Sequence, residues 1–354
     1  MGEKTLMKGN EAVAEAAIKA GCRYFFGYPI TPQNDVPAYM ARRLPEVGGT
    51  FLQAESEVAA SNMVYGAAGA GARVMTSSSS PGISLKAEGI SYIAGAELPA
   101  VIVNMMRGGP GLGGIQPSQA DYFQSTKGMA HGDFRLCVLA PSSVQELVDL
   151  TMDAFEIADE YRNPVMILGD GMIGQMMEPV EFKDEVDPDK LPKKEWATDG
   201  AEGREKNVIN SLALDPQNLE DHNWKLKEKY DRMKENEVRY ETYNMEDADL
   251  AIVAYGTTAR IAISAMEMAR KEGIKVGLIR PITLFPFPTQ VIRDAAENVD
   301  SFLGVEMSTG QMIEDVRLAV EGRKPVHFHG RSGGMIPSPE EIYEKVKEHM
   351  GGDR

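Results

Sequence analysis

The chain of 354 residues is 43% hydrophobic and 25% charged, a balance typical of a globular protein and not of a disordered one. Its length suffices for two domains of about 150 residues each. The net charge of −16 argues against a nucleic-acid-binding surface, because such a surface needs a basic patch to neutralise phosphates.

Residues 5–180 alternate helical and strand patterns. An amphipathic helix is expected over 10–20, where apolar side chains recur at helical spacing, and a helix of small residues is expected over 56–69. Strands are expected, in chain order, at 23–28, 51–53, 73–75, 100–106, 136–140 and 165–168. Short buried strands that alternate with helices predict an α/β protein with a doubly wound, mainly parallel sheet.

Residues 181–245 break this rhythm, because they are charged and poor in aliphatic side chains. We interpret them as a connector with one polar helix near 220–237. The alternation resumes in a second, smaller α/β domain, and a final helix begins at Ser338, whose hydroxyl forms a capping-box pattern with Glu341. Strands are expected there at 250–255, 275–279, 302–305 and 326–329, and helices at 258–272, 289–298 and 311–320. The predicted divisions are 1–180, 181–245 and 246–354.

Cysteine content and hydropathy limit the location and the cofactors of the chain. Cys22 and Cys137 are too few for a 4Fe–4S cluster, which takes four thiolates, and they form no disulfide framework. We expect both thiols to be buried among apolar side chains. The N-terminus lacks the apolar core of a signal peptide, and no run approaches the roughly 18 apolar residues of a membrane span. These features predict a cytoplasmic protein without a membrane association.

Four loops each follow a predicted strand, and ligands of parallel α/β sheets bind outside the carboxyl ends of the strands. The first loop, 27–32, reads GYPITP. Pro29 and Pro32 restrict the backbone on either side of Thr31 and make the loop stiff. The Thr31 hydroxyl could contact a ligand or cap the next helix, and the two roles are compatible.

The second loop places Glu57 in the first turn of the helix of small residues. A carboxylate at this position gains from the helix dipole and would lie beside a closely packed interior. Two interpretations remain open: a functional carboxylate, and a surface glutamate that only complements the dipole.

The third loop, 76–82, carries four consecutive serines, from Ser77 to Ser80, at the entry to a helix. Its hydroxyls and amides could present themselves to a polar ligand, or the segment could be a plain flexible loop. The fourth loop begins with Arg107 at a strand end and continues as the glycine-rich stretch 108–114. The planar guanidinium of arginine matches the two oxygens of a carboxylate. A structural ion pair is the alternative role of Arg107.

Three other patterns are weaker. The stretch 109–114 satisfies G-x-G-x-x-G, but Pro110 and Pro117 interrupt the helix that a dinucleotide site requires, and no acid follows at the expected offset. Asp170 lies in a Gly-Asp-Gly sequence that opens a magnesium–diphosphate motif, yet the next asparagine is Asn207, too far away. We therefore expect Asp170 to start a helix or a turn. The two histidines of strand 326–329 lack further ligands, so no metal site is predicted.

Together, in this order and spacing, the four loops resemble the pyrimidine-binding domain of the 2-oxoacid:ferredoxin oxidoreductases. Segments 256–258, 280–288 and 306–311 resemble the transketolase C-terminal-like domain of the same family. The resemblance covers most of the chain outside 181–245. It is closest to the B subunit of four-subunit enzymes that act on 2-oxoisovalerate (3-methyl-2-oxobutanoate).

The resemblance implies a role for each loop. Glu57 matches the glutamate that hydrogen-bonds N1′ of the aminopyrimidine of thiamine diphosphate, which activates the cofactor as a carbon nucleophile. Thr31 and Arg107 match the pair that holds the substrate carboxylate. The expected catalytic residues are thus Glu57, Thr31 and Arg107. The remaining cofactor-binding residues are expected to be Tyr28, Pro29, Ser80, Pro81 and Gly82.

The chain lacks the family's diphosphate–magnesium domain and its cluster cysteines. The resemblance therefore implies a β-type subunit that holds diphosphate and Mg²⁺, a small ferredoxin-like subunit with 4Fe–4S clusters, and a γ-type subunit. The implied enzyme, active only with these partners, converts a 2-oxoacid, CoA and oxidised ferredoxin to acyl-CoA, CO₂ and reduced ferredoxin.

The expected substrate is a branched-chain 2-oxoacid, with 2-oxoglutarate and pyruvate as alternatives. Two other classes of function stay open at this point. One is a non-catalytic assembly subunit of such a complex, and the other is a decarboxylase or transketolase-like enzyme that makes no reducing equivalents.

Overall fold

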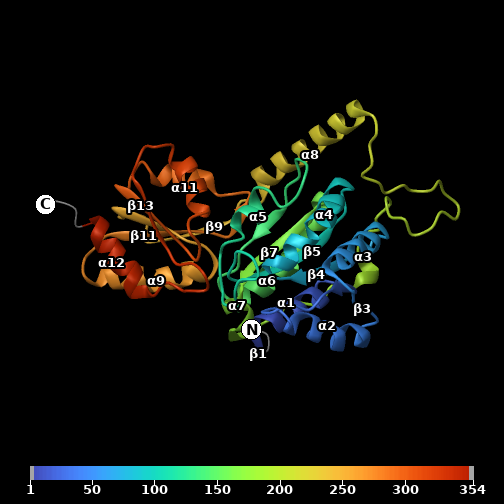
Figure 1. Cartoon of the computed structure of the whole chain (residues 1–354), viewed down its shortest axis with the longest axis horizontal. Helices are drawn as coiled ribbons and strands as arrows, with labels where there is room; N and C mark the ends of the chain where they lie inside the picture. The colour runs from blue at the N-terminus through green and yellow to red at the C-terminus, as the bar shows by residue number, and fades with distance from the viewer. Residues whose placement is uncertain (1–3, 351–354) are drawn as a thin grey trace.

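The computed structural model describes residues 4–350 and contains two α/β units that lie side by side (Figure 1). The larger unit is built on a seven-stranded sheet with the order β12-β6-β7-β5-β4-β2-β3. All of its neighbouring strands pair in parallel except β12, which is antiparallel to β6. The strands are β2 (Tyr24–Gly27), β3 (Thr50–Gln53), β4 (Val74–Ser78), β5 (Ala100–Met106), β6 (Cys137–Leu139), β7 (Pro164–Asp170) and β12 (Thr283–Phe285).

Side chains of this sheet alternate between two apolar layers. Phe25 and Met75 belong to the cluster shared with α1 and α2, whereas their neighbours Phe26 and Val74 belong to the cluster shared with α3. Alternation along a strand therefore separates the two faces, as in a doubly wound sheet. The helices of this unit are α1 (Gly9–Lys19), α2 (Asp35–Glu46), α3 (Glu57–Gly69), α4 (Ser80–Gly95), α5 (Tyr122–Thr126), α6 (Val144–Tyr161) and α7 (Gly171–Gln175).

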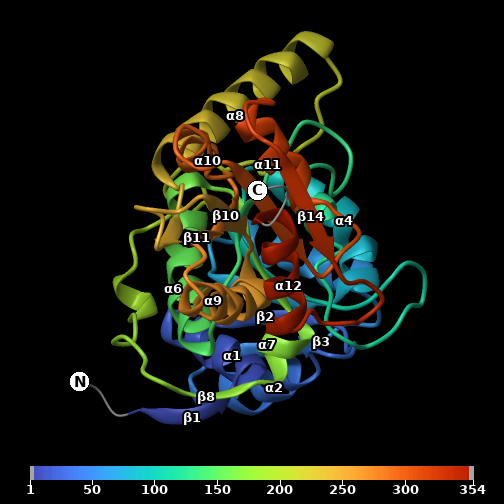
Figure 2. The same ribbon diagram turned by 90° about the vertical axis from the view of Figure 1, so that its left-hand side faces the viewer.

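The smaller unit has a five-stranded sheet with the order β14-β13-β10-β11-β9, parallel except for β9. Its helices α9 (Gly256–Lys271) and α12 (Pro339–Met350) pack against each other, as Figure 2 shows. Its other helices are α10 (Thr289–Ala295) and α11 (Met312–Val320). Its strands are β9 (Tyr240–Tyr243), β10 (Leu250–Val253), β11 (Val276–Pro281), β13 (Ser301–Glu306) and β14 (Val326–Gly330).

The elements expected from the sequence are confirmed in type, including the capping box of the last helix. The Glu341 amide donates to Ser338 Oγ at 3.2 Å, and the Ser338 amide donates to Glu341 Oε2 at 2.9 Å. The expectation for 76–82 needs correction, because β4 runs on to Ser78 and α4 begins at Ser80. This segment is buried strand and helix start, and the alternative of a flexible loop is wrong.

The segment 181–245 contains the short helix η1 (Pro188–Lys190) and the polar helix α8 (Pro216–Asn236), which lies along the larger unit in both views (Figures 1 and 2). Strand β9 near its end joins the smaller sheet. Two further strands, β1 (Thr5–Lys8) and β8 (Met177–Val180), form an antiparallel pair. The division of the chain at 180 and 245 stays a prediction.

Polar contacts hold the two units together. Strand β12 leaves the smaller unit and completes the edge of the larger sheet. The Gln119 side chain donates to the Tyr255 carbonyl at 2.9 Å and accepts from the Met307 amide at 2.9 Å. Arg280, 2% exposed, donates two bonds to Glu146, at 2.9 and 2.7 Å. Segments of the second unit that resemble the family thus help to fix the two units relative to each other.

Within residues 4–350, no helix combines the length and the apolar character needed to cross a membrane.

Candidate active site

The predicted site residues converge at the carboxyl edge of the larger sheet. Thr31 follows β2, Glu57 is the first residue of α3 after β3, and Arg107 directly follows β5. The parallel strands β3, β2, β4 and β5 are neighbours in that order, so their carboxyl ends meet at one edge. This is the edge at which parallel α/β sheets bind ligands.

Arg107 is 8% exposed and lies against the loop after β2. Its Nη1 donates to the Thr31 carbonyl at 2.9 Å, and its Nη2 donates to the Leu112 carbonyl at 3.1 Å. Its Nε is buried without a hydrogen-bond partner, and no carboxylate in residues 4–350 forms an ion pair with it. The alternative of a structural ion pair is therefore wrong. A buried guanidinium without a counter-charge is costly and favours binding of an anion.

Thr31 is exposed beside this guanidinium. Its Oγ1 accepts a 3.4 Å bond from Asn34 Nδ2, and α2 begins only at Asp35. Thr31 lies too far before the helix to act as its N-cap, so the capping alternative is wrong. The hydroxyl proton stays available to a ligand.

Glu57 is 6% exposed, so the alternative of a surface glutamate is wrong. Ser56 caps α3 by accepting the Ala59 amide at 3.2 Å, which places Glu57 in the first turn. The carboxylate then packs against α4 at Gly82. A Cβ at Gly82 would lie 2.8 Å from Glu57 Oε1 and 2.1 Å from Ser78 Oγ. Only glycine leaves room for these two groups to lie so close to α4.

Ser80 links the start of α4 to the end of β5 through hydrogen bonds. Its hydroxyl donates to Asp121 Oδ2 at 2.6 Å and accepts the Arg107 amide at 3.0 Å, and its own amide donates to Asn104 Oδ1 at 3.1 Å. Burial raises the pKa of Asp121, while donors from Ser80 and Asn104 oppose the shift. The hydroxyl of Ser80 is thus engaged within the protein and holds the start of the Arg107 segment.

Buried polar atoms without partners gather at the same edge. They are Gln33 Nε2, Ser78 Oγ, Ser79 Oγ and Arg107 Nε. Gln33 belongs to this group because its Oε1 accepts a 2.5 Å bond from the Ser77 hydroxyl of β4. Buried polar atoms are normally hydrogen-bonded, so such a cluster indicates a site for a polar ligand.

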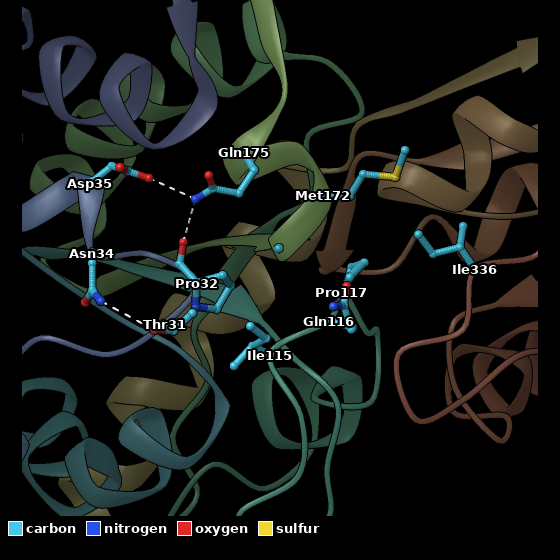
Figure 3. A pocket seen from close by; sticks show the side chains of 11 residues that line it. Thr31, Pro32, Asn34, Asp35, Ile115, Gln116, Pro117, Met172, Gln175 and Ile336 are labelled. Carbon is cyan, nitrogen blue, oxygen red and sulfur yellow. Dashed lines mark hydrogen bonds between the residues drawn. The ribbon is translucent and has the colours of Figure 1, made fainter.

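A pocket of about 530 Å³ opens beside Thr31 (Figure 3). Its apolar lining comes from Pro32, Ile115, Pro117, Met172 and Ile336, the last from the second unit, and no lysine, arginine or histidine lines it.

Asp35 is the charged residue of this pocket. Gln175 Nε2 donates to Asp35 Oδ2 at 2.8 Å and to the Pro32 carbonyl at 3.0 Å. Burial alone would raise the pKa of Asp35, but donors from Asn10 and Gln175 and the charge of Lys8 outweigh burial and lower it. The pocket is thus apolar with one anionic wall, which suits an apolar group and disfavours a second carboxylate.

The weaker patterns have structural explanations. After β5 the glycine-rich stretch forms a closed loop without a helix, and a Cβ at Gly113, where φ is +59°, would lie 2.0 Å from the Gly108 carbonyl oxygen. Asp170 caps α7 by accepting the Met172 and Ile173 amides at 2.8 and 3.2 Å, as expected. Residues 4–350 contain no group of three metal-ligating side chains. Cys22 and Cys137 are fully buried, and burial raises the pKa of each thiol to about 12.

Sequence reasoning missed several polar residues at this edge. Gln33, Asn104 and Asp121 look like ordinary polar residues in the sequence, and only their burial identifies them. Lys86 is also fully buried, on α4, where its Nζ donates to Thr76 Oγ1 at 3.0 Å. A signal existed for Lys86, since it follows Gly82 by one helical turn within a helix of small and apolar side chains.

Comparisons with known proteins identify the family of the chain. Residues 15–268 match the family "Pyruvate flavodoxin/ferredoxin oxidoreductase, thiamine diP-bdg", and residues 248–342 match "Pyruvate:ferredoxin oxidoreductase core domain II". The chain is 55% identical to the ketoisovalerate oxidoreductase subunit VorB of Methanothermobacter thermautotrophicus, over 98% of both chains. It is 37% identical to the 2-oxoglutarate synthase subunit KorA of Archaeoglobus fulgidus, over 98% of this chain and 100% of that one.

Two solved structures are also similar. A 2-oxoglutarate:ferredoxin oxidoreductase of Magnetococcus marinus, with 2-oxoglutarate, coenzyme A and succinyl-CoA bound, superposes with a TM-score of 0.87 at 27% identity, over 99% of this chain and 66% of that chain. An inactive β4 tetramer of a split-gene transketolase superposes with a TM-score of 0.61 at 15% identity, over 100% of both chains, and shares the fold alone.

Proposed function

Because the chain belongs to the 2-oxoacid:ferredoxin oxidoreductase family, we propose that it is the subunit that holds the substrate carboxylate and the pyrimidine end of thiamine diphosphate. The observation that carries the proposal is the buried Arg107 guanidinium without a counter-charge, beside Thr31 and at the same sheet edge as Glu57. The reaction is the oxidative decarboxylation of a 2-oxoacid to acyl-CoA with reduction of ferredoxin.

The proposal assigns a role to each polar residue of the site. Thiamine diphosphate, when bound, supplies the carbon nucleophile and the electron sink. Glu57 accepts a hydrogen bond from N1′ and shares a proton with that atom. Arg107 and the Thr31 hydroxyl bind the carboxylate of the 2-oxoacid and so orient its carbonyl carbon. The unpartnered atoms of Ser78, Ser79 and Gln33 fit a polar heterocycle at this edge.

We further propose that the cofactor site is divided between subunits. What supports the division is Asp170, whose carboxylate caps α7 and is 2% exposed, which makes it unsuited to holding Mg²⁺. A β-type subunit would then hold diphosphate and Mg²⁺. Burial raises the pKa of both cysteine thiols, which makes them poor cluster ligands. The 4Fe–4S clusters and the docking site of ferredoxin would then lie on partner subunits, which include a small ferredoxin-like subunit and a γ-type subunit. A reducing cytoplasm suits such an assembly.

The isolated chain is expected to bind thiamine diphosphate weakly or not at all, because the diphosphate carries most of the ligand's charge. Isothermal titration calorimetry on the purified chain, with Mg²⁺ present, measures this directly. The complete complex, titrated in the same buffer, is the control. Micromolar, Mg²⁺-dependent binding to the isolated chain would refute the division of the site.

For the substrate, we propose a branched-chain 2-oxoacid, 2-oxoisovalerate. The apolar pocket beside Thr31, with Asp35 as its charged wall, fits an isopropyl group better than the second carboxylate of 2-oxoglutarate. The similarity to a ketoisovalerate oxidoreductase subunit over nearly the whole chain supports the same choice.

The complex is expected to reduce a low-potential electron acceptor faster with 2-oxoisovalerate plus CoA than with 2-oxoglutarate or pyruvate plus CoA.

Met172→Arg places a cation in the pocket, so the ratio of kcat/KM for 2-oxoglutarate to that for 2-oxoisovalerate should rise by about tenfold or more, the equivalent of one charged hydrogen bond. Met177→Arg, at an exposed position outside the pocket, is the matched control. Preference of the parent complex for 2-oxoglutarate would contradict the assignment.

A further inference from the structure

Lys86 is an ammonium group enclosed in the interior of the larger unit. Its side chain is 0% exposed on α4, at the crossing of α4 with α3. Gly82, one turn before it, contacts Glu57, and Gly89, one turn after it, would place a Cβ 2.2 Å from Ser61 Oγ of α3. Glu57 and Ser61 are themselves one turn apart. Lys86 therefore lies between these two close contacts of the helices.

Strand β4 closes the remaining side of the space around the Lys86 ammonium. Thr76 and Ser78 alternate to the same face of β4 as Val74, toward α3. Lys86 Nζ donates to Thr76 Oγ1 at 3.0 Å, and that hydroxyl donates its own proton to the Phe26 carbonyl at 2.6 Å. Ser78, two residues along the strand, meets Gly82 and Glu57. Lys86 and Glu57 thus share one buried layer, with neutral hydroxyls between them.

The charges in this layer act on each other. Burial lowers the pKa of Lys86 to about 8, and the charge of Glu57 opposes that shift. Glu57 is the charged group of α3 that faces Lys86, β4 contributes only hydroxyls, and β5 contributes the amide of Asn104. Along α4, Asp121 meets the helix at Ser80, more than one turn away. A buried cation and a buried carboxylate in one layer stabilise each other's charged form.

We propose that Lys86 is a positioning residue that holds Glu57 in its carboxylate form, so that the proton shared with the cofactor lies on N1′ and not on Glu57. The inference rests on the proposed role of Glu57. Without the ammonium, the carboxylate form of Glu57 loses the opposite charge in its layer, so less of the shared proton lies on N1′. The fraction of cofactor in its activated tautomer falls accordingly, although substrate contacts at Arg107 and Thr31 are unchanged.

Lys86→Met in the complete complex keeps an unbranched side chain that is only one heavy atom shorter, and it removes the charge. The acid limb of the kcat/KM profile should move to higher pH by about one unit or more, the usual effect of an opposite charge nearby. The circular dichroism band of the iminopyrimidine form of bound thiamine diphosphate should weaken by a similar factor. Lys86→Arg restores the charge and should restore both signals.

Thr76→Val gives a second test that does not depend on assembly of the methionine variant. Valine is nearly isosteric with threonine but lacks the hydroxyl that accepts the hydrogen bond of the ammonium. The pKa of Lys86 should therefore be lowered further. Because deprotonation of Lys86 removes its charge, we expect activity to decline on the alkaline side of the profile, and in Thr76→Val this decline should begin at lower pH.

A lowered melting temperature with an unchanged pH profile and an unchanged dichroism band, in either variant, would overturn the proposal and leave Lys86 a structural residue. Full turnover of a Glu57→Gln complex would instead refute the proposed function itself. The two failures are therefore distinguishable in one set of preparations.

Discussion

Replacement of Glu57 by glutamine is expected to lower turnover of the complete complex by about 10²–10⁴-fold, the range typical of a positioned acid–base group. Glutamine keeps the shape and one hydrogen bond but cannot share a proton with N1′. Glu57 is 6% exposed and touches Gly82 and Ser78, so the isosteric change leaves this packing in place. Steady-state kinetics and a thermal melt on the same preparation give the two quantities to compare.

The melting temperature should fall far less than the turnover. Loss of the Glu57 charge leaves Lys86 without its partner, but the ammonium can release its proton, because its pKa is already lowered to about 8. That release limits the cost of burial.

Glu55→Gln is the matched control for this measurement. Glu55 is exposed, two residues before Glu57, and lies outside α3. The control should retain full turnover. Equal losses from the two substitutions would reject the assignment of Glu57.

Arg107→Lys is expected to lower kcat/KM for the 2-oxoacid by about tenfold to a hundredfold, while the affinity of the complex for thiamine diphosphate stays nearly unchanged. One lost charged hydrogen bond corresponds to roughly 1.5–3 kcal/mol. Lysine keeps the charge but lacks the planar fork that can hold the Thr31 and Leu112 carbonyls and a carboxylate together. Kinetics across substrate concentrations and a cofactor titration check the two expectations.

Arg42→Lys, at an exposed position of α2, is the control for the same chemical change elsewhere. A purely structural role of Arg107 gives a different result. The loop held through Leu112 would loosen, and the complex would melt at lower temperature or fail to assemble. A lowered melt with unchanged kcat/KM per active site would defeat the carboxylate role.

The sequence alone was enough to predict the fold class and the edge at which the site lies. Strand 100–106 and helix 311–320 were confirmed, because the patterns that indicate them are local properties of the chain. The convergence of Thr31, Glu57 and Arg107 followed from topology, since each comes directly after a strand of one parallel sheet. Their catalytic roles stay predictions.

Other features depend on neighbours that are distant in the sequence. Strand β12 has three residues and exists because β6 offers it an open edge, so no local pattern could indicate it. Thr31 is no helix cap, because α2 begins three residues later than its hydroxyl would require. Such boundaries depend on tertiary packing as well as on propensity.

The polar chemistry of the site was decided only by the tertiary structure. The sequence was compatible with an ion pair at Arg107. The fold instead shows a guanidinium that donates to two carbonyls and has one nitrogen without a partner. The hydroxyl of Ser80 is engaged with Asp121, 41 residues away, and Lys86 is buried in the layer that contains Glu57. Periodicity determines which face of an element is buried. Which charges meet on that face is set by pairs of side chains that only the folded chain brings within a few ångströms.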